Sequence, residues 1–194
     1  MNRHTVRRAI AELRAEGAVR VVQGQGTFVE WSRIAWRIGT VAEFVPYATR
    51  QGRRPETQIL TTDVGPCSPP AACELSLETK TPVLRVAFLR ALDGAPWVLE
   101  RRELPWPRFA GLPGILSQTR SMTASLARLG APDIRRGRCR ISCGLPTEED
   151  ASLLCTRPDR PAFTVEFVDS SPALGPVSWS QVIAPGDRMR LLTR

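Results

Sequence analysis

The side chains near the amino terminus are suited to contact with a polyanion. Polar and basic residues recur there at helical spacing: Arg3, His4, Thr5, Arg7, Arg8 and Arg14. A helix lying in the major groove of duplex DNA presents such groups to base edges and phosphates. A basic helix taken alone is more often a solvated surface helix, so the neighbouring elements must decide between the two interpretations.

The elements around these side chains favour DNA. Val6, Ile10 and Leu13 form an apolar stripe, which predicts an amphipathic helix. Asn2 is suited to cap the start of that helix. The glycine-rich turn at 23–26 lies between two short apolar runs and predicts a hairpin. A helix followed by a glycine-tipped hairpin is the second half of a winged helix, so the combination favours DNA binding.

Composition bounds the size and location of the protein. The 194 residues, 42% of them apolar, allow one ordinary domain plus a small one. The formal charge of +8 comes almost wholly from arginine, because Lys80 is the only lysine. Residues 1–37 hold seven arginines against three glutamates, so the charge is concentrated where DNA binding is expected. No apolar run is long enough to span a membrane and no secretory signal is visible, so a cytoplasmic protein without membrane contact is expected.

The five cysteines invite a metal or redox interpretation, which the sequence disfavours. Cys139 and Cys143 lie four residues apart in a strand-like segment. No histidine accompanies them, because His4 is the only one in the chain. We therefore expect reduced structural thiols, no metal site and no cofactor.

The chain beyond the hairpin predicts an α+β domain built on an antiparallel sheet. Asp93-Gly94 is a two-residue hairpin signal, and strands joined by so short a turn must be antiparallel. Ser121 and Thr147 are suited to cap short helices. Alternating apolar runs predict strands at 57–64, 83–92, 97–104, 134–145, 162–169, 177–184 and 189–192.

The first thirty residues resemble the recognition helix and wing of the GntR family of bacterial transcription regulators. The matching residues are Asn2, Arg3, Thr5, Val6, Arg7, Ala9, Glu16, Gly17, Gln23, Gly24, Gly26, Thr27, Phe28 and Val29. The resemblance implies that Arg3, Thr5 and Arg7 contact bases or adjacent phosphates. It places His4 at the neighbouring groove edge.

Further DNA contacts are expected at the wing tip and at Arg8. The resemblance implies that Gln23 and Gly24, at the wing tip, enter the minor groove. Gln25 stands where the family mostly carries Arg or Lys, so a weaker wing contact is expected. Arg8 is equally suited to a phosphate contact and to a solvated surface position.

In that family the recognition helix is the third of three, whereas here it begins one residue after Met1. One hypothesis is a start codon assigned too late, with the preceding helices encoded upstream in the same frame. The alternative is a naturally truncated protein whose apolar stripe cannot build a stable DNA-binding domain alone.

Residues 39–192 resemble the UTRA effector domain of the HutC subfamily, which shares the fold of chorismate lyase. The similarity is clearest in residues 51–53, 89–96, 108–112, 121–126, 146–149 and 187–188. Several of these segments are most similar to PhnF-like regulators of phosphonate operons. The resemblance implies a domain that binds a small molecule.

The same resemblance points to Arg90, Glu100, Ser121 and Thr123 as effector-binding residues. An anionic ligand needs guanidinium donors, and a carboxylate can orient hydroxyls or an amine. Simpler roles stay open, because Arg90 and Glu100 could form a cross-strand ion pair and Ser121 could be a helix cap. Phe88 stands where a second anion-binding arginine is common, so a small or weakly charged anion such as a phosphonate is expected.

Together these features predict a transcription regulator, expected to be a repressor, with a partial winged helix at 1–30, a linker at 31–38 and an effector domain at 39–194. Its expected partners are a double-stranded DNA operator, a small-molecule effector and a second copy in a homodimer. One alternative is an effector-binding or dimerisation protein that cannot bind DNA. An enzyme like chorismate lyase is disfavoured, because the effector region has no histidine and no Gly-x-Ser-x-Gly motif.

Overall fold

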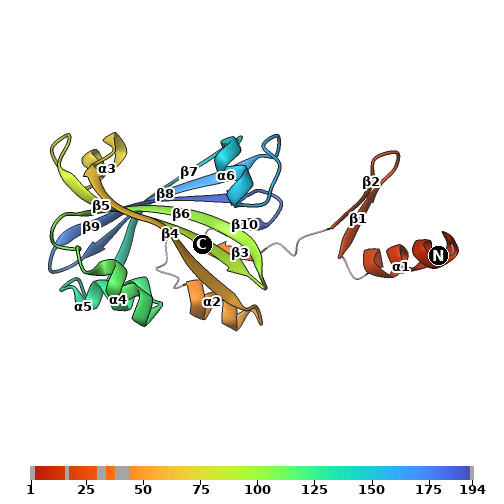
Figure 1. Cartoon of the computed structure of the whole chain (residues 1–194), viewed down its shortest axis with the longest axis horizontal. Helices are drawn as coiled ribbons and strands as arrows, with labels where there is room; N and C mark the ends of the chain where they lie inside the picture. Colours follow the sequence, from red (N-terminus) through yellow and green to blue (C-terminus); the bar gives the residue numbers. More distant parts are fainter. Residues whose placement is uncertain (1–2, 16–17, 30–33, 38–43, 193–194) are drawn as a thin grey trace.

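The amino-terminal helix and hairpin are both present in the structure, a computed structural model that describes residues 3–15, 18–29, 34–37 and 44–192 (Figure 1). Helix α1 spans Arg3–Ala15. Strands β1 (Val19–Val22) and β2 (Gly26–Val29) pair antiparallel. The expected cap Asn2 and the expected helix stop Gly17 lie outside the described residues.

Two glycines shape the hairpin turn. Gly24 has φ 77° and Gly26 has φ 118°, a region of backbone conformation that only glycine adopts readily. The amide of Gln25 donates to the carbonyl of Val22 at 3.0 Å and closes the turn. The turn therefore projects its two glutamines and the glycine between them from the end of the hairpin.

The second part of the chain is built on one six-stranded antiparallel sheet, in the order β4-β5-β6-β9-β8-β7. This arrangement confirms the predicted α+β fold. Asp93 and Gly94 form the two-residue turn of a hairpin in this sheet. Both have positive φ (52° and 78°), as the common two-residue hairpin turn requires. The strands are β4 (Pro55–Pro66), β5 (Pro82–Leu92), β6 (Ala95–Pro105), β7 (Arg135–Gly144), β8 (Ala162–Ser171) and β9 (Gly175–Pro185).

Helices cover both faces of this sheet, as Figure 1 shows. One face carries α2 (Phe44–Arg50), α4 (Leu112–Thr119) and α5 (Met122–Arg128), and the other carries α3 (Pro69–Glu74) and α6 (Glu148–Leu153). Because both faces are covered, most residues of the central strands β6 and β9 are buried.

The core follows this layering. Phe88, Leu104 and Val86 pack with Leu112 and Leu126 between the sheet and helices α4 and α5. On the opposite face, apolar residues of α3 and α6 cover the strands in two smaller clusters. Burial of these side chains supplies the main driving force for folding.

A short strand lies within the segment expected to be a linker. Ile34–Arg37 forms strand β3, which pairs in parallel with β10 (Met189–Leu192). Parallel pairing between segments so far apart in the chain leaves no local signal in the sequence, which is why residues 31–38 were expected to be linker throughout.

Two helices carry a proline in their first turn. Pro113 sits in the first turn of helix α4. Pro46 likewise lies in the first turn of α2. Amides of the first turn have no partner within the helix, so a missing N–H there costs little.

Candidate functional site

All eight residues expected to contact DNA lie on the surface. Arg3, His4, Thr5, Arg7 and Arg8 are exposed on α1, and Gln23, Gly24 and Gln25 are exposed at the tip of the β1–β2 hairpin. The helix and the tip of the hairpin therefore both present accessible polar groups.

Arg8 makes a local ion pair. Its Nε donates to Glu12 at 3.2 Å, and the two side chains are 85% and 65% exposed. Pairs this exposed contribute little to stability. Arg8 therefore stays available to exchange Glu12 for a phosphate.

The stripe on the other side of α1 is only partly covered. Val6 and Ile10 are half-buried, and Leu13 is 41% exposed. The described residues thus leave apolar surface on this helix open.

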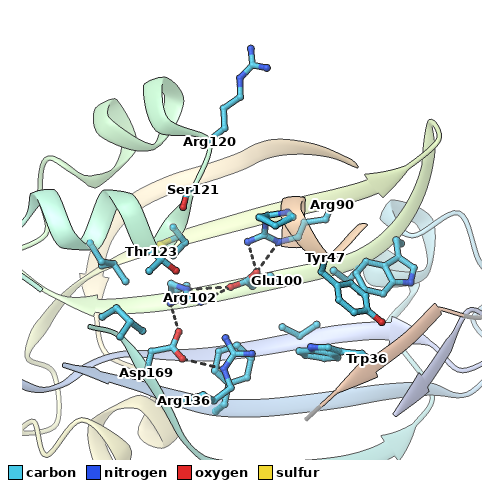
Figure 2. Close-up of a pocket in the computed structure, with 18 residues that line it drawn as sticks. Trp36, Tyr47, Arg90, Glu100, Arg102, Arg120, Ser121, Thr123, Arg136 and Asp169 are labelled. Carbon is cyan, nitrogen blue, oxygen red and sulfur yellow. Dashed lines mark hydrogen bonds and ion pairs between the residues drawn. The ribbon is translucent and has the colours of Figure 1, made fainter. Parts of the chain in front are cut away.

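A cavity opens between the sheet and the helices α2 and α5 (Figure 2). Its volume is about 90 Å³, on a scale where one buried water needs roughly 10 to 15 Å³, so it has room for a small organic molecule. The lining residues are Trp36, Pro46, Tyr47, Arg90, Trp97, Val98, Glu100, Arg102, Arg120, Ser121, Met122, Thr123, Leu126, Ile134, Arg136, Phe167, Asp169 and Val182.

The two ends of the cavity differ in character. Trp36 and Tyr47 lie at one end, and Ser121 and Thr123 lie at the other (Figure 2). Arginines and carboxylates of the sheet run between them. The cavity thus combines an aromatic wall with a charged floor.

The charged floor is a chain of alternating ion pairs. Arg90 donates through Nε and Nη2 to one oxygen of Glu100, at 2.9 and 2.8 Å. Arg102 donates through Nε and Nη2 to the other oxygen, at 3.2 and 2.8 Å. Nη1 of Arg102 donates to Asp169 at 2.9 Å and to Ser178 at 2.8 Å. Nε of Arg136 donates to the second oxygen of Asp169 at 3.1 Å.

These buried groups keep one another ionised. Burial by itself would raise the pKa of Glu100, but the charges and hydrogen bonds of Arg90 and Arg102 lower it to about 2. Burial would lower the pKa of Arg102, but Glu100 and Asp169 raise it. Both groups stay ionised at neutral pH, and three guanidiniums face two carboxylates.

Arg136 is fixed by stacking as well as by its ion pair. Its guanidinium carbon lies 3.5 Å from the centroid of the Phe167 ring. A guanidinium over an aromatic face is stabilised by the ring quadrupole. The side chain is 8% exposed, so Arg136 is nearly buried at the cavity surface.

The four expected effector residues all line this cavity. The ion pair and the helix cap that were considered as simpler roles are present as well. Arg90 and Glu100 are paired, and Ser121 Oγ accepts the amide of Ala124 at 3.2 Å as the cap of α5. Thr123 is the second residue of the same helix. A residue can therefore form an ion pair or cap a helix and line the cavity at the same time.

The structure also contains arginines that the sequence interpretation did not assign. Phe88 lies in the core, but Arg102 and Arg136 supply further cations to the cavity, and Arg120 lies at its edge. Arg102 could have been found, because it shares a strand face with Glu100 two residues earlier. Arg136 could not, because its position depends on the order of strands in the sheet.

Trp36 belongs to the segment expected to be a linker. It lies on β3, packs against the core cluster around Trp97 and lines the cavity. The unexpected pairing of β3 with β10 is what brings it there.

The cysteines form no disulfide. Within the part of the chain that the structure describes, no three His, Cys, Asp or Glu side chains are grouped to hold a metal ion. Burial raises the pKa of the Cys139 thiol, with Arg136 acting in the opposite direction. Among the described residues, no helix is both long and apolar enough to cross a bilayer.

Family comparisons agree with this architecture. The family described as UTRA domain matches residues 50–190, and the family described as bacterial regulatory proteins, gntR family, matches residues 1–29. The chain belongs to the GntR family of transcription regulators, in the group that carries a UTRA effector domain. It is therefore a transcriptional regulator by family.

Individual relatives support the same assignment. An uncharacterized HTH-type transcriptional regulator of Rhizobium meliloti is 31% identical over 192 residues, which cover 98% of this chain and 79% of the relative. A probable fructoselysine utilization operon transcriptional repressor of Escherichia coli is 26% identical over 110 residues, or 56% of this chain and 44% of that protein.

The fold is shared with PhnF from Mycobacterium smegmatis. That crystal structure aligns with a TM-score of 0.74 at 24% identity, over 100% of this chain and 85% of that one. Its isolated effector domain aligns with a TM-score of 0.73 over 83% of this chain and 98% of that one, at 22% identity.

Proposed function

We propose that this regulator is a repressor whose binding to operator DNA is controlled by a small anionic effector in the cavity. The observation that carries the proposal is the cavity floor, where the guanidiniums of Arg90, Arg102 and Arg136 outnumber the carboxylates of Glu100 and Asp169. A nearly buried surplus of positive charge is favourable for an anion that brings the missing negative charge.

On the DNA side, Arg3, Thr5 and Arg7 are proposed to contact base edges or adjacent phosphates in the major groove. His4 and Arg8 would contact the neighbouring backbone. Supporting this, every one of these side chains is exposed on α1. The proposed wing contacts are Gln23, Gly24 and Gln25 at the hairpin tip.

The proposed effector-binding residues are Arg90, Glu100, Ser121 and Thr123, which come from two strands and one helix. Glu100 would contribute by holding Arg90 in place. Because these elements close one cavity, a ligand that bridges them would favour one arrangement of the domain. We propose a DNA-binding unit at 1–30 and an effector domain from 39 onward, to which β3 also belongs by its pairing with β10.

Two copies are proposed to act together in the cytoplasm. A two-fold dimer matches a palindromic operator, and effector binding would change the placement of the two DNA-binding units.

A second candidate function is an effector-binding protein that does not bind DNA by itself. It is favoured by the partly open apolar stripe of α1, where Leu13 is 41% exposed. Such a protein would still bind the anion but would show no sequence preference on DNA.

Fluorescence anisotropy with DNA from upstream of the gene separates these candidates. The chain, and the chain extended upstream in the same reading frame, are titrated into this duplex and into a scrambled duplex of equal length. A repressor prefers its own duplex by at least about 100-fold in one of these forms. Equal affinity for both duplexes in both forms would contradict DNA regulation and leave the second candidate.

A further inference from the structure

Glu100 cannot recognise a ligand hydroxyl in this cavity. A carboxylate offers about four acceptor positions. Arg90 fills two at one oxygen and Arg102 fills two at the other. The role expected for Glu100, orienting hydroxyls or an amine of the effector, is therefore not supported by its bonding.

The remaining acceptors are few. Asp169 already accepts from Arg102 and Arg136, and its side chain is only 3% exposed. Glu100 and Asp169 are the only carboxylates among the described lining residues, which include no Asn or Gln. The other side-chain acceptors in the lining are the hydroxyls of Tyr47, Ser121 and Thr123, and Ser121 already accepts from the Ala124 amide. A polyhydroxylated ligand would therefore find no open carboxylate for its many donors.

Arg136, by contrast, offers donors to an acceptor. Its Nε is bonded to Asp169, while Nη1 and Nη2 make no hydrogen bond with any described residue. The side chain is more than nine-tenths buried and faces the cavity beside Asp169 (Figure 2). Its stacking on Phe167 fixes the plane of the guanidinium, so the two Nη groups form a fixed fork suited to a carboxylate-type head.

The net charge of the floor and the aromatic lining restrict the class of ligand further. The three guanidiniums of the floor exceed its two carboxylates by one, which suits a single negative charge. Arg120 is exposed and points away from the cavity (Figure 2). Trp36, Tyr47 and Trp97 also line the cavity, and aromatic faces favour a flat apolar group.

We propose that the effector is a monoanionic organic acid with a flat apolar body, whose head is bound by Nη1 and Nη2 of Arg136 and whose body lies against Trp36 and Tyr47. This inference rests on the proposed effector function of the cavity. It assigns Arg136 as the anchor and excludes sugar phosphates as the preferred ligand class.

Four probes test the ligand class on the intact chain. Benzoate, benzyl alcohol, phenylphosphonate and glucose 6-phosphate are titrated while tryptophan fluorescence is followed, since Trp36 and Trp97 line the cavity. Isothermal calorimetry confirms each affinity. We expect saturable binding of benzoate, weaker binding of the more highly charged phenylphosphonate, and at least about 10-fold weaker binding of benzyl alcohol and glucose 6-phosphate.

Arg136→Gln tests the anchor, with Arg138→Gln as its matched control. Arg138 lies on the same strand and is exposed, outside the cavity. Losing charge-assisted bonds should weaken benzoate binding roughly 10- to 100-fold in Arg136→Gln and less than about 2-fold in Arg138→Gln. If Arg136→Gln does not fold, the ranking of the four probes on the wild-type chain still decides the ligand class.

Several results would overturn the inference. Glucose 6-phosphate binding more tightly than benzoate would contradict the ligand class, and equal binding of benzyl alcohol and benzoate would contradict an anionic head. Unchanged benzoate affinity in Arg136→Gln would remove Arg136 as the anchor, and no saturable benzoate binding would reject the inference altogether. Failure of DNA regulation itself would appear separately, in the duplex titration.

Discussion

Arg102 is the residue on which the cavity floor depends. It is 3% exposed and is the one side chain that joins Glu100 to Asp169 within the described network. A buried charge is tolerated only when it is paired and hydrogen-bonded. The stability of the floor and its net charge therefore arise from the same contacts.

Removing Arg102 should destabilise the fold strongly. Arg102→Met leaves two buried carboxylates short of a partner, which should lower the free energy of unfolding by about 3 to 5 kcal/mol. Urea denaturation measures the change. The control is Arg157→Met, because Arg157 pairs with Asp159 at the surface, where a pair is worth less than about 1 kcal/mol. Equal losses in the two variants would show that the buried network is not a special determinant of stability.

The pH dependence of stability should carry the signature of Glu100. Its pKa falls from 4.5 to about 2 in the folded chain, so its contribution is complete above about pH 4.5 and is lost as pH falls toward 2. The unfolding free energy of the wild type should therefore decline over this range. In Glu100→Gln this part of the decline should disappear. Parallel curves for the two proteins would contradict the low pKa.

Residue chemistry was only partly predictable from the sequence. Arg90, Glu100, Ser121 and Thr123 line one cavity, but how Glu100 is bonded could not be foreseen. A linear sequence does not show that two arginines fill all of its acceptor positions, because this depends on the side-chain conformations of Arg90 and Arg102.

Among the secondary-structure elements, β3 is the strand that lines the cavity and follows the β1–β2 hairpin in the sequence. It pairs with β10, and the amide of Ile34 donates to the carbonyl of Arg188 at 3.0 Å. The Arg188 guanidinium in turn donates to the carbonyls of Pro96, Leu154 and Cys155, each at 2.7 Å. Residues 30–33 alone separate β3 from the end of the wing. A ligand that contacts Trp36 thus acts on a strand close in sequence to the wing.

Trp36→Ala should uncouple the effector from DNA. The side chain lines the cavity, so its loss should weaken the effect of benzoate on duplex affinity by at least about 10-fold, while affinity without benzoate changes less than about 2-fold. Anisotropy with and without benzoate measures both quantities. Trp106→Ala is the control, because Trp106 is exposed and lies outside the cavity. An unchanged benzoate response in Trp36→Ala would exclude β3 as the connecting element.

Elements were predictable where the signal is local. Alternation and the Asp93-Gly94 turn predicted the antiparallel sheet, and Ser121 and Thr147 predicted the starts of α5 and α6. The pairing of β3 with β10 has no such signal. Helix α4 has no clear local signal either, because Pro113 is compatible with a loop as well as with a first helical turn.

Considered as a whole molecule, the chain should act as a dimer. Sedimentation velocity with labelled upstream duplex should give two chains per duplex, because a two-fold protein matches two half-sites. One chain per duplex at saturation would contradict the dimer.

Arg8→Ala should bind the same duplex with a salt slope reduced by about 1, since Arg8 can exchange Glu12 for a phosphate.

We propose above all that the exposed face of α1 recognises a specific DNA sequence. The most direct measurement is the ratio of affinities for the upstream duplex and a scrambled duplex, in the wild type and in Arg7→Ala, at fixed salt. We predict that Arg7→Ala lowers this ratio by roughly 10- to 100-fold, because a base contact of this kind is worth about 1 to 3 kcal/mol. A ratio that is unchanged in Arg7→Ala, or equal to one in the wild type, would contradict the account.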